Sequence, residues 1–162
     1  MFKKLKDIYL DLYFLFFPAT RLRKSGARIG KNIFFGKYTY FELENAKYIE
    51  ISDDCVISAF CKFIPHDSSL NNVLGRPVLY GKIILEKNCY VGANTTLLAG
   101  TRVGKNTIVG ANSLVKGNLK PNSVYVGSPV KYLCSIYELD KKWERRKDKK
   151  FIYKKQKRWH EN

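Results

Sequence analysis

The chain has 162 residues, of which 45% are hydrophobic, and carries a formal net charge of +16. This length corresponds to one domain, and no low-complexity linker divides it. The longest apolar stretch is about ten residues, shorter than the roughly 20 residues that a membrane-spanning helix needs.

Residues 1–28 are predicted to form an N-terminal helix and a connection. The helix covers 2–17, and Pro18 is predicted to end it. A signal peptide is one alternative, but Asp11 interrupts the apolar run and no small-residue cleavage site follows. A helix packed on the domain is expected. An interfacial membrane anchor is the other alternative, because the apolar residues over 14–17 cannot all face one side.

The strongest feature is an uninterrupted six-residue repeat. Its first position is aliphatic throughout, at Leu85, Val91, Leu97, Val103, Val109 and Val115. Its fourth position is asparagine five times, at Asn88, Asn94, Asn106, Asn112 and Asn118. Asparagine tolerates the left-handed backbone conformation that a tight corner requires. A fixed short period of this kind predicts a β-helix of stacked short strands.

Two earlier runs have the same spacing, so the repeat extends toward the N-terminus. They are Ile29, Phe35 and Phe41, and then Ile51, Ile57 and Phe63. Three hexapeptides make one turn of a triangular prism, which predicts four coils. We assign these coils to 29–46, 51–68, 85–102 and 103–120.

An insertion over 67–82 interrupts the regular coils and is predicted to be a loop. Long loops that interrupt a solenoid are often functional. Asp67 and Arg76 on this insertion are therefore expected to contact substrate.

The cysteines and histidines argue against a metal site. Cys55, Cys61 and Cys89 fall at the fifth position of the repeat, a small inward slot where cysteine behaves as a compact hydrophobe. None has metal-ligand spacing, and two histidines cannot supply a three-histidine zinc site. No metal is expected.

His66 is the candidate general base. It occupies the fourth position of its hexapeptide, a corner slot from which a side chain projects out of the prism. An imidazole can remove a proton from a hydroxyl group near neutral pH. An isolated exposed histidine is more often incidental, so the sequence context decides its role.

That context is a resemblance to the hexapeptide-repeat acyltransferases, and among them to the capsule and lipopolysaccharide sugar O-acetyltransferases. It is carried by VGANTTLLAGTRVGKNTIVGANSLV and the later PNSVYVGSPVKYL. The resemblance implies an all-β core, a left-handed parallel β-helix over 29–133. It also implies that His66 is the catalytic base. Tyr90, in the segment NCYVG where many members have tryptophan, is implied to contact substrate.

The resemblance further implies acetyl-CoA as a co-substrate. Ala93 and Ala111 match positions whose backbone binds the pantetheine arm, although corners also need small residues for purely structural reasons. Lys116 matches a polar residue near the adenine end. Lys131 matches a basic residue that meets the phosphates. The family also implies a homotrimer with acetyl-CoA between subunits.

Residues 134–162 are predicted to form a basic C-terminal helix or tail. Residues 141–159 include eleven lysines and arginines but only two acidic residues, Glu144 and Asp148. This charge indicates either a solvated surface or peripheral contact with anionic lipids. Aromatic residues are interleaved, but no recognised nucleic-acid module accompanies them, so nucleic acid is not an expected partner.

The expected reaction is transfer of an acetyl group from acetyl-CoA to a sugar hydroxyl in capsule or lipopolysaccharide biosynthesis. N-acetylation of a nucleotide-linked amino sugar and a non-enzymatic β-helix scaffold remain alternatives. The expected location is the cytoplasm, with contact at the inner face of the cell membrane left open. The acid that orients His66 is also open. Four candidates lie on earlier coils: Glu42, Glu44, Asp53 and Asp54.

Overall fold

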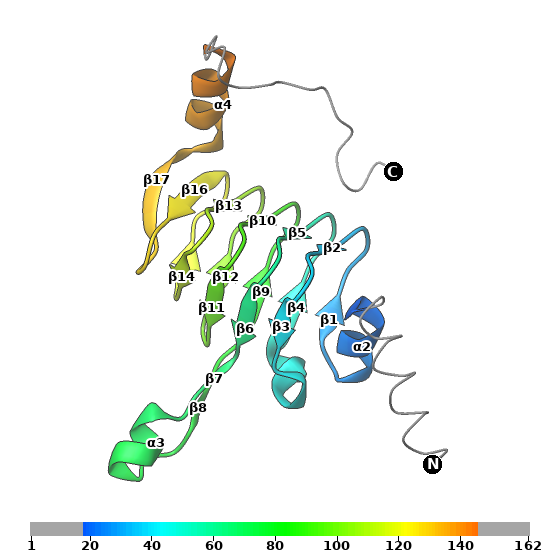
Figure 1. Cartoon of the computed structure of the whole chain (residues 1–162), viewed down its shortest axis with the longest axis vertical. Coiled ribbons are helices and arrows are strands. Elements are labelled where there is room, and N and C mark those ends of the chain that lie inside the picture. The colour runs from blue at the N-terminus through cyan, green and yellow to red at the C-terminus, as the bar shows by residue number, and fades with distance from the viewer. Residues whose placement is uncertain (1–17, 146–162) are drawn as a thin grey trace.

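A computed structural model describes residues 18–145 of the chain, which wind into a triangular prism of short strands (Figure 1). The neighbours in the prism are parallel strands from successive coils. This is the left-handed β-helix expected from the six-residue repeat.

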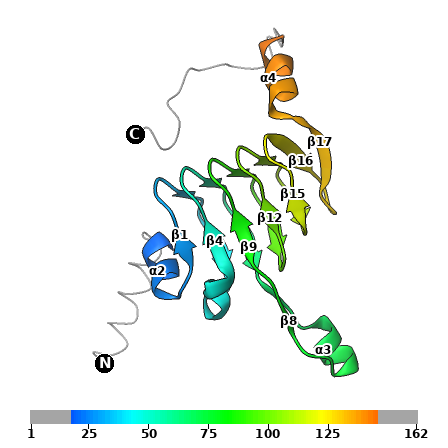
Figure 2. The same ribbon diagram turned by 180° about the vertical axis from the view of Figure 1, so that it is seen from behind.

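The prism has three faces, numbered here in the order in which the chain meets them. The first face holds β1 (Arg28–Ile29), β4 (Ile49–Ile51), β9 (Ile83–Leu85), β12 (Arg102–Val103) and β15 (Asn118–Leu119), and Figure 2 shows them side by side. The second face holds β2 (Phe34–Phe35), β5 (Val56–Ile57), β10 (Tyr90–Val91), β13 (Ile108–Val109) and β16 (Ser123–Val126). The third face holds β3 (Tyr40–Phe41), β6 (Lys62–Ile64), β11 (Thr96–Leu98) and β14 (Leu114–Val115). These strands make the four expected coils and part of a fifth.

The repeated aliphatic side chains fill the interior of the prism. All six residues of the main run are fully buried: Leu85, Val91, Leu97, Val103, Val109 and Val115. The fifth repeat position is also buried, and its hydroxyl and thiol groups donate to backbone oxygens, as from Thr101 to Val115 at 2.9 Å. Cys55, Cys61 and Cys89 are free and buried in this slot, as expected.

The corner between the first and second faces, called the first corner, is built on left-handed asparagines. Asn88, Asn106 and Asn122 have φ between 55° and 59°. The side-chain amide of Asn88 donates to Asn106, and that of Asn106 donates to Asn122, at 2.9 and 2.8 Å. The prediction that Asn118 is a corner residue is wrong. Gly117 takes the left-handed conformation (φ 85°), and Asn118 begins β15. The chain reaches buried Leu119 only four residues after Val115, so the repeat is two residues short there.

Both irregular segments leave the corner between the third and first faces, called the third corner. The first is η1 (Leu43–Tyr48), a 3-10 helix. The second is an arm made of β7 (His66–Asp67), α3 (Ser69–Leu74) and β8 (Leu79–Tyr80), which projects from the prism (Figure 1). The expected plain loop over 67–82 is therefore an antiparallel hairpin with a short helix at its tip.

The ends of the described chain cover the ends of the prism. Helix α2 (Pro18–Lys24) buries Leu22 against the first coil. Helix α2 begins at Pro18, since proline is tolerated at the start of a helix. The expected helix over 2–17 lies outside the described residues.

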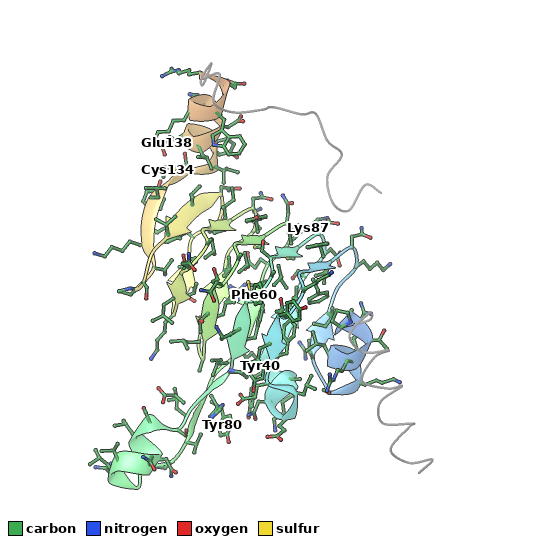
Figure 3. The ribbon with its side chains drawn as sticks, viewed as in Figure 1. Tyr40, Phe60, Tyr80, Lys87, Cys134 and Glu138 are labelled. Carbon is green, nitrogen blue, oxygen red and sulfur yellow. The ribbon has the colours of Figure 1, made fainter. Side chains whose placement is uncertain are left out.

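At the other end, β17 (Lys131–Ser135) pairs antiparallel with β16 and leads into α4 (Ile136–Glu144). Ser135 and Glu138 form a capping box at the start of α4 (Figure 3), and hydrogen bonds from the Ser135 backbone and hydroxyl lower the pKa of Glu138. The predicted C-terminal helix is thus present over α4, and residues 146–162 lie outside the described part. Between residues 18 and 145, no helix is long and apolar enough to cross a membrane.

Candidate active site

His66 and Glu42 form a close pair at the third corner. Nδ1 of His66 lies 2.7 Å from Oε2 of Glu42, and both side chains are partly buried, at 28% and 15% exposed. A carboxylate accepts a hydrogen bond only from a ring nitrogen that carries a proton. This contact therefore favours the tautomer with the proton on Nδ1. Nε2 is then the basic nitrogen. Of the four acids left open by the sequence, Glu42 is the partner.

The stacking of coils explains this contact. Phe41 in β3 is paired with Phe63 in β6, and their rings stack with centroids 4.6 Å apart. The two residues that follow each strand therefore leave the same corner one above the other. Glu42 comes directly after β3, and His66 follows β6 across Pro65. The paired residues Phe41 and Phe63 are 22 positions apart. His66 lies three residues after Phe63 and Glu42 lies one residue after Phe41, which gives the separation of 24.

Two tyrosines support the base of the arm. Tyr80 in β8 is paired with His66 in β7, and its ring centroid lies 6.1 Å from the imidazole (Figure 3). Tyr48 at the end of η1 stacks on Tyr80 at 5.5 Å. The sequence analysis missed both residues, because the pairing of two irregular segments has no repeat to reveal it.

A pocket of about 420 Å³ opens beside His66. Its lining comes from the third face, the arm and the last full coil: Ile64, His66, Asp67, Ser68, Ser69, Leu79, Leu98, Ala99 and Lys116. Of the predicted site residues, His66, Asp67 and Lys116 therefore lie together. Lys116 lies at this pocket, whereas the resemblance implied a place for it near the adenine end of acetyl-CoA.

Asp67 stabilises the start of α3 as well as lining the pocket. Its carboxylate accepts a hydrogen bond from the backbone N–H of Ser69 at 2.9 Å. The hydroxyl of Ser69 and this N–H lower the pKa of Asp67, and the positive charge of Lys116 acts in the same direction. Asp67 is exposed and ionised near neutral pH, so the pocket mouth carries one negative and one positive group.

Ala93 and Ala111 lie elsewhere, at the corner between the second and third faces, called the second corner. They are stacked in adjacent coils, and the backbone N–H of Asn112 donates to the carbonyl of Ala93 at 2.9 Å. A Cβ on the preceding Gly92 would lie 2.4 Å from the backbone nitrogen of Ala111, so only glycine fits there. Gly92 thus has a structural role, while half-buried Ala93 and exposed Ala111 present only methyl groups at this corner.

The other predicted site residues are apart from His66 within one chain. Tyr90 lies on the second face, 42% exposed, and its hydroxyl is 3.2 Å from Oγ of Ser58. Arg76 lies at the tip of the arm, where its carbonyl accepts a hydrogen bond from the Asn71 side chain. Lys131 is exposed on β17. The arrangement brings together the base, its acid and two charged groups, but not these three residues.

The cysteines of the described chain are all buried, and no candidate metal cluster occurs among the described residues. Burial raises the pKa of the Cys61 thiol, which keeps it in the unreactive protonated form. Over residues 18–145, no group of three histidine, cysteine, aspartate or glutamate side chains could hold a metal ion. His66 is the one group near the pocket that suits proton transfer at neutral pH.

Comparison with known proteins agrees with this fold. Residues 82–117 match the family model described as bacterial transferase hexapeptide (six repeats). The chain carries the hexapeptide repeat of the bacterial transferases. The expected resemblance to hexapeptide-repeat acyltransferases is confirmed, and the hexapeptide-repeat acetyltransferase VCA0836 of Vibrio cholerae shares the fold, with a TM-score of 0.53 and 19% identity over 71% of this chain and 77% of that one.

Two named relatives match the hexapeptide-repeat chain over part of its length. The putative lipopolysaccharide biosynthesis O-acetyl transferase WbbJ of Escherichia coli K12 is 35% identical over 63 residues, which are 39% of this chain and 32% of WbbJ. The galactoside O-acetyltransferase of Lactococcus lactis is 38% identical over 59 residues, 36% and 28% of the two chains. The chain thus spans about a third of the length of these relatives.

A third similarity is to a solved structure with ligands. A variant of AntD, an N-acyltransferase from Bacillus cereus, was crystallised with dTDP and coenzyme A. It aligns with a TM-score of 0.55 and 25% identity over 74% of this chain and 81% of AntD. This similarity covers a larger share of the chain than the matches to WbbJ and the galactoside O-acetyltransferase.

Proposed function

We propose that this protein is an acetyltransferase that moves the acetyl group of acetyl-CoA to a sugar hydroxyl. The observation that carries the proposal is the His66–Glu42 pair, 2.7 Å apart, at the edge of a pocket in a hexapeptide-repeat β-helix. A histidine oriented by a carboxylate is suited to take a proton from a hydroxyl group.

In the proposed mechanism, acetyl-CoA supplies an activated thioester. Nε2 of His66 takes the proton of the acceptor hydroxyl, which makes the oxygen nucleophilic toward the acetyl carbon. Glu42 accepts the hydrogen bond from Nδ1–H and stabilises the imidazolium that forms. His66 then returns the proton to the departing sulfur, so the pair is restored at the end of each cycle.

The residues that fit acetyl-CoA are those with small side chains or positive charge. Ala93 and Ala111 present only methyl groups at the second corner, which suits close approach of the pantetheine arm. Lys131 is an exposed cation suited to phosphate groups. Lys116 lines the pocket together with His66, so its charge acts at the reacting end of the cofactor.

The acceptor we favour is a sugar hydroxyl of capsule or lipopolysaccharide, because WbbJ and the galactoside enzyme are named as O-acetyltransferases. N-acylation of a nucleotide-linked amino sugar is the second candidate. It is favoured by the likeness to AntD, an N-acyltransferase crystallised with dTDP and coenzyme A. The same base serves both reactions, because an amine also loses a proton when it attacks a thioester.

The proposal includes a homotrimer in which Tyr90 of one chain meets the pocket of another. Outward side chains of the second face form an apolar row, Phe34, Val56, Tyr90 and Ile108, given by the strand register. The arm exposes Leu70, Val73 and Leu74 on α3, which buries none of its residues. Two apolar surfaces at different places on one chain support a ring of copies.

We also propose a cytoplasmic location with peripheral contact at the inner membrane face. Helix α4 carries Trp143, 60% exposed, beside Lys141, Lys142 and Arg145. An exposed tryptophan among cations suits the surface of an anionic bilayer.

The test of the function is thiol release from acetyl-CoA by the purified protein with galactosides, lipopolysaccharide and a dTDP-linked amino sugar as separate acceptors. Release that depends on a sugar hydroxyl supports O-acetylation, and release only with the amino sugar supports the second candidate. No release with any acceptor, from a folded protein that still oligomerises, would favour the non-enzymatic scaffold.

A further inference from the structure

Two aromatic residues occupy a backbone conformation that disfavours them. Tyr38 and Phe60 lie at the second corner with φ of 59° and 63°, in the left-handed region. The same corner in the next two coils is formed by Asn94 and Asn112, with φ of 58° and 57°. Asparagine is common in this conformation, whereas a bulky side chain is a genuine outlier. The fold therefore accepts asparagine at this corner, and the backbone conformation does not explain why Tyr38 and Phe60 occupy it.

Packing of the core does not explain the two aromatic residues either. Tyr38 is 69% exposed and Phe60 is 53% exposed, so neither fills the interior. Their rings instead stack on each other outside the prism, with centroids 5.2 Å apart and planes 20° apart. Strained positions that a fold does not require tend to belong to binding surfaces.

The aromatic pair continues onto the third face, toward the candidate active site. Tyr40 in β3 points outward, is 54% exposed, and is paired with exposed Lys62 in β6 (Figure 3). Glu42, which holds His66, is two residues further along the same strand direction. At roughly 3.3 Å per residue, Tyr38 and Glu42 are at most roughly 13 Å apart along the chain. One surface therefore runs from the stacked rings past Tyr40 to the pocket.

The chemistry of this surface favours a polar ligand over a second protein copy. Exposed Lys37 and Lys62 flank the rings, and lysine is depleted at the centres of protein interfaces. A sugar ring matches this mixture, because it presents C–H groups on its faces and hydroxyl groups around its rim. Aromatic side chains can cover the former, and lysine ammonium groups can donate to the latter.

We propose that Tyr38, Phe60 and Tyr40 form a platform that binds further sugar units of the acceptor, beside the unit that reacts at His66. The acceptor is then an oligosaccharide or polysaccharide chain, not a single sugar. This proposal rests on the proposed function for the reaction at His66, but sugar binding by the platform is measurable without any transfer.

The decisive variant is the double substitution Tyr38→Asn and Phe60→Asn, which installs the residue that the same corner carries in later coils. The fold should therefore survive. The control is Tyr137→Asn, since Tyr137 is 64% exposed on α4, away from this surface. Binding is measured by saturation-transfer NMR with β-galacto-oligosaccharides from one to four units, in the absence of acetyl-CoA.

The wild-type protein and the control should bind the tetrasaccharide at least tenfold more tightly than the monosaccharide. The double variant should lose that gain while its mass in solution stays unchanged. Equal tetrasaccharide binding by the double variant, or no binding at any length by the wild type, overturns the proposal. A changed mass assigns the rings to a contact between copies and also overturns it. If length-dependent binding is found but no glycan causes thiol release, the platform stands and the proposed transfer reaction fails.

Discussion

Oε2 of Glu42 accepts a hydrogen bond from Nδ1 of His66 at 2.7 Å, although the two residues are 24 positions apart in the chain. Stacking of the first two coils brings them to the same corner, where η1 and the arm both leave the prism. The pair therefore depends on the regular part of the fold for its position and on the irregular part for its surroundings.

Replacing His66 by alanine tests the general base. We expect turnover to fall roughly 10²–10⁴-fold, the contribution usual for a positioned proton acceptor. Acetyl-CoA affinity should change little, because the groups that fit it are mainly elsewhere. Steady-state kinetics and equilibrium binding of acetyl-CoA measure both effects, and near-wild-type turnover in a folded His66→Ala protein would remove His66 from the mechanism.

Replacing Glu42 by glutamine tests the orienting role. The amide keeps the shape but loses the charge that stabilises the imidazolium, so we expect kcat to fall roughly 10- to 10³-fold. KM for the acceptor should stay within about threefold, since Glu42 contacts His66 but does not itself line the pocket. The matched control is Glu44→Gln, an exposed acid two residues away on η1. Equal losses in the two variants would contradict a specific role for Glu42.

The aromatic corner should limit stability. A left-handed conformation costs a non-glycine residue about 1–2 kcal/mol, and asparagine less, while stacking of two rings returns about 0.5–1.5 kcal/mol. We therefore expect Tyr38→Asn with Phe60→Asn to raise the free energy of unfolding by up to about 1 kcal/mol. Urea denaturation of the double variant against the wild type measures this. A loss of several kcal/mol would mean that the rings hold the first two coils together.

Glu50 should make stability depend on pH. A hydrogen bond from Nζ of Lys82, at 2.5 Å, lowers the pKa of Glu50, and the charges of Lys82 and Arg28 add to this effect. Because the pKa of Glu50 is lowered in the folded state, Glu50 stabilises the protein at pH values above the unfolded pKa of 4.5. This stabilisation is lost as the pH falls through the folded pKa. Glu50→Gln should therefore cost less than about 1 kcal/mol at pH 7, because the pair is partly solvated.

That cost should shrink as the pH falls below 4.5 and vanish once both states are protonated. Denaturation at pH 7 and at about pH 3 compares the wild type with Glu50→Gln. A difference of the same size at both pH values would mean that Glu50 acts through packing instead of charge.

The regular coils could be predicted because one residue type recurs at each position. Val91 or Val103 is identified as interior by its neighbours six residues away. The prediction that Asn118 is a corner residue was wrong because it relied on the same constant period. The period shortens by two residues after Val115, and the corner asparagine is Asn122. Counting in steps of six misplaces every residue after the shortened repeat. The pairing of Leu119 with Val103 in the structure reveals the shift.

The candidate site was predictable only where it belongs to the repeat. His66 was found as an exception at a corner position, but its partner was one of four acids, because the path of η1 decides which of them reaches it. Tyr80 lies beside His66 because β7 and β8 pair in a hairpin, which the six-residue period does not predict. Tyr90 was expected to contact substrate, but it lies on another face than His66, since position along a coiled chain does not give the direction of a side chain.

The two insertions share the third corner, and the other two corners carry none within the described residues. Loops of varied length can be closed there at little entropic cost, while the ladder between coils continues unchanged on all three faces. The prism can therefore keep the His66–Glu42 pair and exchange the part of the arm beyond Asp67 for a segment of another length or composition. The arm's share of the pocket lining and the interior of the prism are thus encoded in separate stretches of sequence, and one can change without the other.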